Sequence, residues 1–147
     1  MVLPAVIIKL SSDIVRDYKK EEGWMKLDHI AIITSDYQKA LKFYGILGFT
    51  EIERVKRPFD IMGMLECDGV WIELFEKAAP ARLTEPETLG LRHLAFNTND
   101  LDGKLEQLHQ NGIETERIRT DLHGRRFTFL KDPDGLPIEI KEALPRK

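Results

Sequence analysis

The stretch LDHIAI at residues 27–32 is repeated as LRHLAF at residues 91–96, and its histidine recurs 64 positions later, as His29 and His93. The same offset stays in register, without a gap, as far as Ile113. A chain that repeats itself at a fixed offset is built from copies of one structural unit. The prediction of the fold therefore starts from this repeat.

A second match extends the repeat to the end of each copy. DGVWIE at residues 68–73 corresponds to DGLPIE at residues 134–139, now at an offset of 66, because two residues have been gained in a loop. The chain thus contains two copies of a unit of about fifty residues, 27–76 and 91–142. The polar, proline-containing linker 77–90 joins them.

Both copies have the same predicted order of elements. Short apolar runs rich in Ile, Leu and Phe predict strands, whereas leucines at helical spacing followed by glycine predict a helix and its end. Each copy contains one strand, one helix and three further strands, so we predict two tandem βαβββ modules of the α+β class. The predicted strands are 27–34, 49–55, 60–66 and 70–76 in the first copy and 91–98, 114–119, 125–131 and 136–142 in the second.

Local signals predict where the helices begin and end. Ser35 and Gln38 form a capping box at the start of the first helix, and Asn99 opens the second helix in a similar way. Gly48 and Gly112 are expected to end the two helices. The predicted helix faces contain Leu41, Tyr44 and Leu47 in the first copy and Leu101, Leu105 and Leu108 in the second.

The last two strands of the second copy are predicted to form a hairpin. The residues between them, Asp132-Pro133-Asp134-Gly135, have proline second and glycine fourth, which is the pattern of a type I turn.

The composition excludes several classes of protein. The 147 residues, 42% hydrophobic and 32% charged, are typical of one soluble globular domain. A net charge of −3 lacks the basic excess that nucleic-acid binding requires. The apolar stretch Val2–Leu10 is interrupted by Pro4 and Lys9, which argues against a signal peptide or a membrane span. Because Cys67 is the single cysteine, we expect a cytoplasmic protein without disulfides.

Residues 1–24 are predicted to be an N-terminal extension before a single domain, 25–147. Ser11 or Ser12 is expected to cap a short helix that ends near Gly23. We assign this extension no function.

A histidine and a glutamate recur at equivalent positions of both copies. Each histidine is followed two positions later by an alanine, whose small side chain leaves room for a ligand on the same strand face. A single strand histidine or glutamate more often has a structural role, but a buried carboxylate costs several kcal/mol unless it is paired or coordinated. Two imidazoles and two carboxylates that converge suit a divalent first-row metal ion. The predicted ligands are His29, Glu73, His93 and Glu139.

These motifs, together with KFYGILGF at residues 42–49 and RRFTFLKDPDGLPIEI at residues 125–140, resemble the vicinal oxygen chelate superfamily. This superfamily includes glyoxalase I, methylmalonyl-CoA epimerase, extradiol dioxygenases and bleomycin-resistance proteins. The resemblance covers residues 27–142 and points to the lactoylglutathione-lyase-like bacterial branch. It implies a curved mixed sheet around a metal-binding cleft, with the four metal positions of the family at the four ligands just named.

The ligand set favours one chemistry of the family. Extradiol dioxygenases use two histidines and one glutamate, and drug-sequestering resistance proteins generally lack the metal set, whereas four ligands with both glutamates resemble glyoxalase I. The resemblance implies a lyase or isomerase that moves a proton through a metal-bound enediolate of a small thiol-derived substrate, with Ni, Co, Zn or Mn as the metal ion. Two alternatives stay open: an acyl-CoA epimerase of the methylmalonyl-CoA type, and a metal-containing protein that binds a small molecule without turnover.

The roles of the two glutamates and the assembly are further expectations. We assign the catalytic base to Glu139, which lies near the chain end, with Glu73, wedged between Trp71 and Phe75, as the alternative. We expect a homodimer, because open sheet edges need covering. In this family the cleft forms either within one chain or between modules of two chains, and the sequence leaves both open.

Guanidinium groups suit the carboxylates of glutathione and the phosphates of CoA equally well. The candidates for binding a substrate anion are Arg126, as first choice, and Arg54, Lys56, Arg57, Arg117, Arg119 and Arg125.

Overall fold

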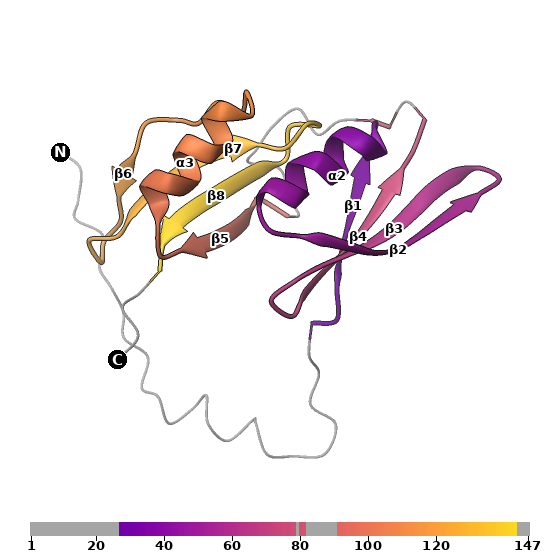
Figure 1. The fold of residues 1–147 in the computed structure, drawn as a ribbon, viewed down its shortest axis with the longest axis horizontal. Helices are drawn as coiled ribbons and strands as arrows, with labels where there is room; N and C mark the ends of the chain where they lie inside the picture. Colours follow the sequence, from indigo (N-terminus) through magenta and orange to yellow (C-terminus); the bar gives the residue numbers. More distant parts are fainter. Residues whose placement is uncertain (1–26, 79, 82–90, 144–147) are drawn as a thin grey trace, which may run out of the picture.

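The protein is described by a computed structural model that covers residues 27–78, 80–81 and 91–143. The chain forms two βαβββ modules that lie side by side, as predicted for an α+β fold (Figure 1). The helix expected within residues 11–23 lies outside the described residues. Among the residues that are described, no helix is both long and apolar enough to cross a membrane.

The first module contains β1 (Ile30–Thr34), α2 (Tyr37–Ile46), β2 (Thr50–Arg57), β3 (Asp60–Cys67) and β4 (Val70–Glu76). The last three strands run antiparallel to one another in turn. The first strand pairs in parallel with β4, so the order across the sheet is β1-β4-β3-β2. The last strand of the module therefore lies in the interior of the sheet, and the first strand lies at its edge.

The second module repeats this arrangement with β5 (Leu94–Thr98), α3 (Leu101–Gln110), β6 (Arg119–Thr120), β7 (Arg126–Lys131) and β8 (Pro137–Glu142). The strand order is β5-β8-β7-β6, with β5 parallel to β8. Each strand thus occupies the place of its counterpart in the first module, which confirms the repeat that the sequence predicted.

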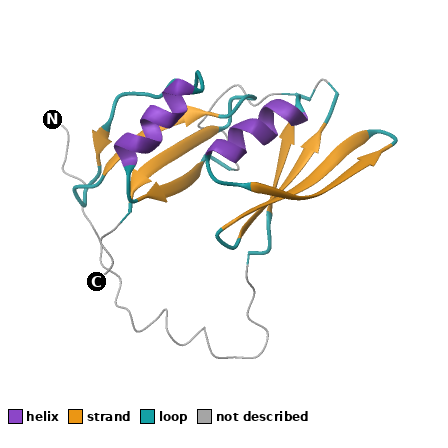
Figure 2. Ribbon diagram, viewed as in Figure 1, coloured by secondary structure: helices purple, strands orange, loops and turns teal. Residues whose placement is uncertain are grey.

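Each helix covers one face of its own sheet, and both helices lie on the same side of the molecule (Figure 2). Ile72 and Leu74 of β4, and Ile138 and Ile140 of β8, are buried in the core. Side chains alternate between the faces of a strand, so the residues between these core positions belong to the opposite face. We call this the open face of each sheet. On β4 it carries Trp71, Glu73 and Phe75, on β7 Phe127 and Phe129, and on β8 Glu139 and Lys141.

Both helix starts differ from the prediction. Asp36 rather than Ser35 caps α2, and Asp100 rather than Asn99 caps α3. In each case the aspartate side chain accepts a hydrogen bond from the backbone N–H three residues later. Aspartate satisfies a free N–H group as well as serine or asparagine does, so adjacent candidates cannot be ranked from sequence alone.

The predicted ends of the helices and the turn are confirmed. Gly48 and Gly112 adopt left-handed φ angles of 110° and 73° directly after the helices. In the turn, the N–H of Gly135 donates to the carbonyl of Asp132 over 2.9 Å. The predicted leucine face of α3 is buried, as is Tyr44 of α2.

The strand predicted at residues 114–119 is wrong in extent. Only Arg119 and Thr120 pair with β7, although the N–H of Glu116 still donates to the carbonyl of Phe129. The segment before β6 runs beside β7 without a continuous ladder of hydrogen bonds, and residues 113–118 therefore form no strand.

The turn between β7 and β8 also fastens the two modules together. The carboxylate of Asp134 accepts hydrogen bonds from the Thr34 hydroxyl over 2.5 Å and from the Ser35 backbone N–H over 3.2 Å, as well as from the Ser35 hydroxyl. Beside it, the buried Tyr44 hydroxyl donates to Asp132 over 2.8 Å. Ser35, which the sequence assigned to a helix cap, thus serves the junction between the modules.

We expect Asp134→Asn to lower the free energy of unfolding by about 1–2 kcal/mol. The carboxylate accepts hydrogen bonds through two oxygens, whereas the amide has only one oxygen that can accept. Urea denaturation of the full chain measures this. Asp68→Asn is the matched control, since Asp68 occupies the equivalent turn of the first module, and it should change stability by less than about 0.5 kcal/mol. Equal losses in the two variants would contradict a role of Asp134 in the junction.

Candidate functional site

The first predicted pair of ligands meets at the edge of the open face of the first sheet. His29 directly precedes β1, and the parallel register places Ala31 opposite Glu73 of β4. The imidazole Nε2 of His29 lies 3.2 Å from Oε2 of Glu73. The alanine leaves the space above its own strand open, so the imidazole and the carboxylate can meet.

The second pair repeats this geometry. His93 directly precedes β5, and Ala95 lies opposite Glu139 of β8. The imidazole Nε2 of His93 lies 3.3 Å from Oε2 of Glu139, and its ring packs edge-on against Phe129 with 5.2 Å between the ring centroids. The structure therefore brings together the two ligands that each module was predicted to supply.

The spacing within each pair fits two neighbouring ligands of one metal ion. Nitrogen and oxygen ligands about 2.0–2.2 Å from a first-row ion lie about 3.0–3.5 Å from each other when they are adjacent in its coordination sphere. The observed separations of 3.2 and 3.3 Å fall in this range. An imidazole nitrogen with a carboxylate oxygen suits Zn, Co, Ni or Mn, so both pairs fit the predicted cofactor.

The two pairs do not meet within one chain. Among residues 27–78, 80–81 and 91–143, no three His, Cys, Asp or Glu side chains lie close enough together to hold a metal ion. The structure thus contains two separate half-sites, one on each module, which we call the first half-site (His29 and Glu73) and the second half-site (His93 and Glu139).

The two half-sites differ in what holds the histidine. In the first, Nδ1–H of His29 donates to the carboxylate of Asp28 over 2.8 Å. This hydrogen bond, opposed by desolvation and supported by Glu73, raises the pKa of His29. Such a bond fixes the imidazole with Nε2 directed at a metal position. Sequence analysis missed Asp28, although it is adjacent to the predicted ligand His29, because the second copy has Arg92 at the equivalent place.

The glutamates also differ in their surroundings. The side chain of Glu139 is 11% exposed and that of Glu73 is 22% exposed. Lys141 lies with Nζ 3.4 Å from Oε1 of Glu139 and 3.0 Å from Asp121. The sequence assigned the catalytic base to Glu139 because a glutamate near the chain end should move easily. The strand that carries Glu139 is flanked on both sides by other strands. Its position near the chain end therefore gives it no mobility, and this reason for the assignment is wrong.

Arg126, the first candidate for a substrate anion, lies on the helix-covered face of the second sheet. Its guanidinium donates to Glu142 over 2.6 Å and to both oxygens of Asp102 of α3 over 3.1 and 2.9 Å. These hydrogen bonds, with Asp102 contributing most, raise the pKa of Arg126. Arg126 is on the opposite face of β7 from Phe127, and therefore away from the half-site of its own module.

Arg57, a less favoured candidate, belongs to a cluster on the open face of the first sheet. Asp60, whose side chain is fully buried, accepts from Nε and Nη2 of Arg57 over 2.5 and 2.6 Å and also from Lys77. Both cations lie over the rings of Phe59 and Phe75, 5.2–5.6 Å from the ring centroids. Sequence analysis missed Asp60 and Lys77 because 17 positions separate them.

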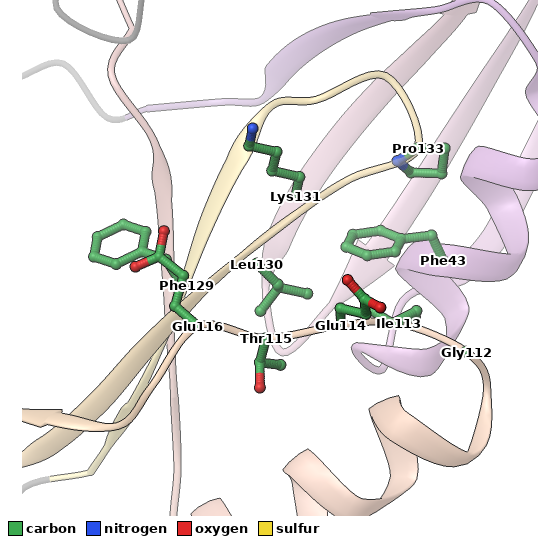
Figure 3. Close-up of a pocket in the computed structure, with 10 residues that line it drawn as sticks. All are labelled: Phe43, Gly112, Ile113, Glu114, Thr115, Glu116, Phe129, Leu130, Lys131 and Pro133. Atoms are coloured by element: carbon green, nitrogen blue, oxygen red, sulfur yellow. The ribbon is translucent and has the colours of Figure 1, made fainter.

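The hollows on the described surface include two that bear on the site. One of about 250 Å³ borders the first half-site and is lined by Asp28, His29, Met64 and Trp71. A wider one of about 620 Å³ lies where the segment after α3 passes β7 and α2 (Figure 3). It is lined by Phe43, Gly112, Ile113, Glu114, Thr115, Glu116, Phe129, Leu130, Lys131 and Pro133. The wider hollow contains none of the four predicted ligands, so the smaller one is the better candidate for a substrate.

The contribution of the Asp60 charge to stability can be tested by changing the pH. Hydrogen bonds from Arg57 hold the pKa of Asp60 at about 2, against burial, which raises it. A carboxyl whose pKa is lower in the folded state stabilises the protein above its unfolded pKa of about 4, and this contribution is lost as the pH falls through about 2.

We therefore expect Asp60→Asn to lower the melting temperature at pH 7, and the difference from the wild type to narrow between about pH 4 and pH 2. Thermal unfolding followed by circular dichroism measures both. Asp102→Asn is the control, because Asp102 also pairs with an arginine but its side chain is 68% exposed, and it should have a smaller effect. A difference that stays constant down to pH 2 would rule out this role of the Asp60 charge.

Comparison with known proteins shows the family of the chain. The model of the Glyoxalase/Bleomycin resistance protein/Dioxygenase superfamily matches residues 26–140. The chain is 48% identical over 124 residues to the uncharacterized protein YwkD of Bacillus subtilis, covering 79% of this chain and 95% of that protein. It is 41% identical to a solved glyoxalase family protein of Enterococcus faecalis, with a TM-score of 0.73 and coverage of 80% and 97%.

More distant relatives have named activities. Human mitochondrial methylmalonyl-CoA epimerase is 25% identical over 130 residues, covering 80% of this chain and 74% of the human protein. A fosfomycin resistance protein, FosX, of Listeria monocytogenes, solved with Mn(II), shares the fold at 21% identity and a TM-score of 0.66, with coverage of 82% and 94%. From the match over residues 26–140, the chain belongs to the glyoxalase, bleomycin resistance protein and dioxygenase superfamily.

Proposed function

We propose that this protein is a cytoplasmic, metal-dependent lyase or isomerase of the glyoxalase I type, which moves a proton between adjacent carbons of a small, thiol-derived substrate. The observation that carries the proposal is the repeated pair of imidazole nitrogen and carboxylate oxygen, 3.2 Å apart in one module and 3.3 Å apart in the other. Four such ligands leave coordination positions of a divalent ion free for substrate oxygens.

The complete metal site, in this proposal, forms between two copies of the chain. The first half-site of one subunit meets the second half-site of its partner, and the twofold axis of a homodimer produces two equivalent sites. The hydrogen bonds from Thr34 and Ser35 to Asp134 fix the modules to each other. Bringing the two half-sites together within one chain would break these hydrogen bonds.

Exposed apolar side chains beside both histidines support this assembly. Leu27, two residues before His29, and Ile33 of β1 are 74% and 48% exposed, and Leu91, two residues before His93, is 55% exposed. Large apolar side chains gathered at a sheet edge mark a surface that another protein covers. A second copy of the chain would cover these residues at the place where the metal ligands need partners.

Mixed dimers test the metal site and its assembly together. His29→Ala and His93→Ala should each bind almost no metal, because each removes one ligand from both sites of the dimer. A dimer with one subunit of each variant regains one intact site, so it should bind about one metal ion while the wild-type dimer binds about two. Differently tagged subunits, coexpressed and purified through both tags, can be measured by elemental analysis.

If the mixed dimer binds no metal while the wild type does, the site lies within one chain. Unchanged metal content in both single variants would remove the proposed site altogether.

In the proposed reaction, a divalent metal ion would stabilise the negative charge that develops on the substrate oxygens. Glu139 would accept the proton from one carbon and return it to the next, as a positioned carboxylate does. A carboxylate that exchanges its partners needs another cation nearby, and Lys141 lies 3.4 Å away. Glu73 lies beside Trp71, and no lysine or arginine of the described residues comes within 4 Å of its carboxylate, so it suits a permanent ligand.

Two glutamine variants test this division of roles. Glu139→Gln keeps the size and one coordinating oxygen but removes the basicity, so turnover should fall by about 10²-fold or more while most of the metal remains bound. Glu73→Gln is the matched control at the equivalent position and should affect metal affinity more than the rate of the metal-loaded protein. Initial rates are measured with a hemithioacetal and with methylmalonyl-CoA. If the Glu139→Gln variant keeps near-normal turnover, the catalytic base is Glu73 instead.

The acyl-CoA epimerase is the second candidate, and the similarity to human methylmalonyl-CoA epimerase supports it. Turnover of methylmalonyl-CoA but not of the hemithioacetal in the same assay would favour it. If neither compound reacts and a small molecule copurifies with the metal-loaded protein, the chain is a binding protein.

A further inference from the structure

The open face of the first sheet carries an unbalanced pair of cations close to the first half-site. Arg57 and Lys77 share the carboxylate of Asp60, and Arg57 also interacts electrostatically with Glu73. Because Glu73 is a ligand of the proposed metal ion, that ion would match its charge, which leaves one positive charge of the pair in excess. Phe75, which lies under both cations, is two residues beyond the metal-ligand candidate Glu73 on the same face of β4. Two residues of a strand span about 7 Å, so this charge lies within reach of a small ligand held at the half-site.

The cluster is organised in advance of any ligand. The Asp60 side chain is fully buried, and it holds the Arg57 guanidinium by two hydrogen bonds of 2.5 and 2.6 Å. Arg57 Nη1 has no partner among the described residues, and Lys77 contacts no carboxylate there other than Asp60. Both side chains remain about one-third exposed, at 33% and 38%. Their unused N–H groups are therefore accessible to a ligand.

Arginines on the helix-covered faces lack this excess. Arg54 pairs with Glu51 alone and lies over the ring of Tyr37, at the start of α2. Arg126 pairs with two carboxylates. These two arginines are matched or outnumbered by carboxylates, which is typical of ion pairs that only hold elements together.

The second module has a similar cluster on its own open face, built from residues at different positions, in which Lys141 also lies 3.4 Å from the ligand candidate Glu139. There Asp121 accepts from both Arg125 and Lys141, and Lys141 lies over the Phe127 ring, 5.5 Å from its centroid. Since the repeat does not align this cluster residue by residue with the first, its recurrence beside each half-site indicates a use for positive charge at this place.

We propose that Arg57 and Lys77 bind an anionic group of the substrate above Phe75, which is two strand residues, or about 7 Å, from Glu73. The inference rests on the proposed function and narrows its substrate class. The substrate would be a small molecule with two neighbouring oxygens at one end, for the metal ion, and a carboxylate or phosphate at the other. A guanidinium and an ammonium, held side by side, suit either anion.

Hydroxamates are suitable probes, because their two neighbouring oxygens chelate a metal ion without undergoing the reaction. The ligands are alkyl hydroxamates of increasing chain length that end either in a carboxylate or in the neutral amide of the same shape. Their dissociation constants for the Mn(II)-loaded full-length protein are measured by calorimetry. At the length that spans the gap, the carboxylate should bind about tenfold more tightly than the amide, which is the usual effect of one charged hydrogen bond.

Arg57→Gln and Lys77→Gln should each reduce this preference to about twofold or less, without changing the affinity for the amide. Arg54→Gln is the matched control, since it also removes a paired arginine that lies over an aromatic ring, but on the helix-covered face. It should keep the full preference. Lys77→Gln leaves the bidentate Arg57–Asp60 pair in place, so it tests the proposal even if Arg57→Gln fails to fold.

A series of hydroxamates that end in a phosphonate distinguishes a phosphate group from a carboxylate group of the substrate. Whichever of the phosphonate and carboxylate ligands binds more tightly identifies the anion that Arg57 and Lys77 accept. Equal affinity for carboxylate and amide at every chain length overturns the anion site while leaving the metal site intact. If no hydroxamate binds, the metal site itself is absent, and the anion site, which is defined by its distance from that metal, is overturned with it.

Discussion

The parallel pairing of the first and last strands of each module is the constraint on which the candidate site depends. In both sheets this register sets an alanine opposite a glutamate, Ala31 opposite Glu73 and Ala95 opposite Glu139. The histidine two residues before each alanine then reaches the carboxylate from the edge of the sheet. A shift by one residue would turn each glutamate toward the helix and bury a charge in the apolar core.

The same pairing leaves each half-site open. The first strand of each module lies at the edge of its sheet, so His29 and His93 are each at a border beyond which the described residues form no further strand. The hydrogen bonds around Asp134 then hold the two modules side by side. Fixed modules with separate half-sites, and exposed leucines next to the histidines, are the reason why we propose that the active unit is a dimer.

Sequence alone predicted the two modules and the turn at residues 132–135, but it missed the helix caps and the true extent of one strand. The two modules and the four proposed ligands follow from internal similarity, because a residue needed at the same place in each copy occurs twice. The helix caps at Asp36 and Asp100 could not be chosen, since neighbouring residues satisfy the same N–H groups. The strand predicted at residues 114–119 has the right composition, but tertiary packing allows only its end to pair.

The polar clusters were beyond prediction for a different reason. Asp60 and Lys77 come together only because β3 and β4 are neighbours, and no local pattern connects them. Arg126 looked favourable beside an apolar run, but alternation along β7 turns it to α3 and two carboxylates. The sequence identifies the arginines that could bind an anion, whereas the fold determines which of them keep N–H groups that no carboxylate of the protein uses.

The most direct test of the account is the position of the bound metal ion, from anomalous scattering of crystals of the Mn(II)-loaded protein. We predict one ion in each of two symmetry-equivalent sites, bound by His29 and Glu73 of one subunit and by the second half-site of its partner. An ion bound by the residues of a single chain would contradict the shared site, and an ion bound away from all four ligands would contradict the account as a whole.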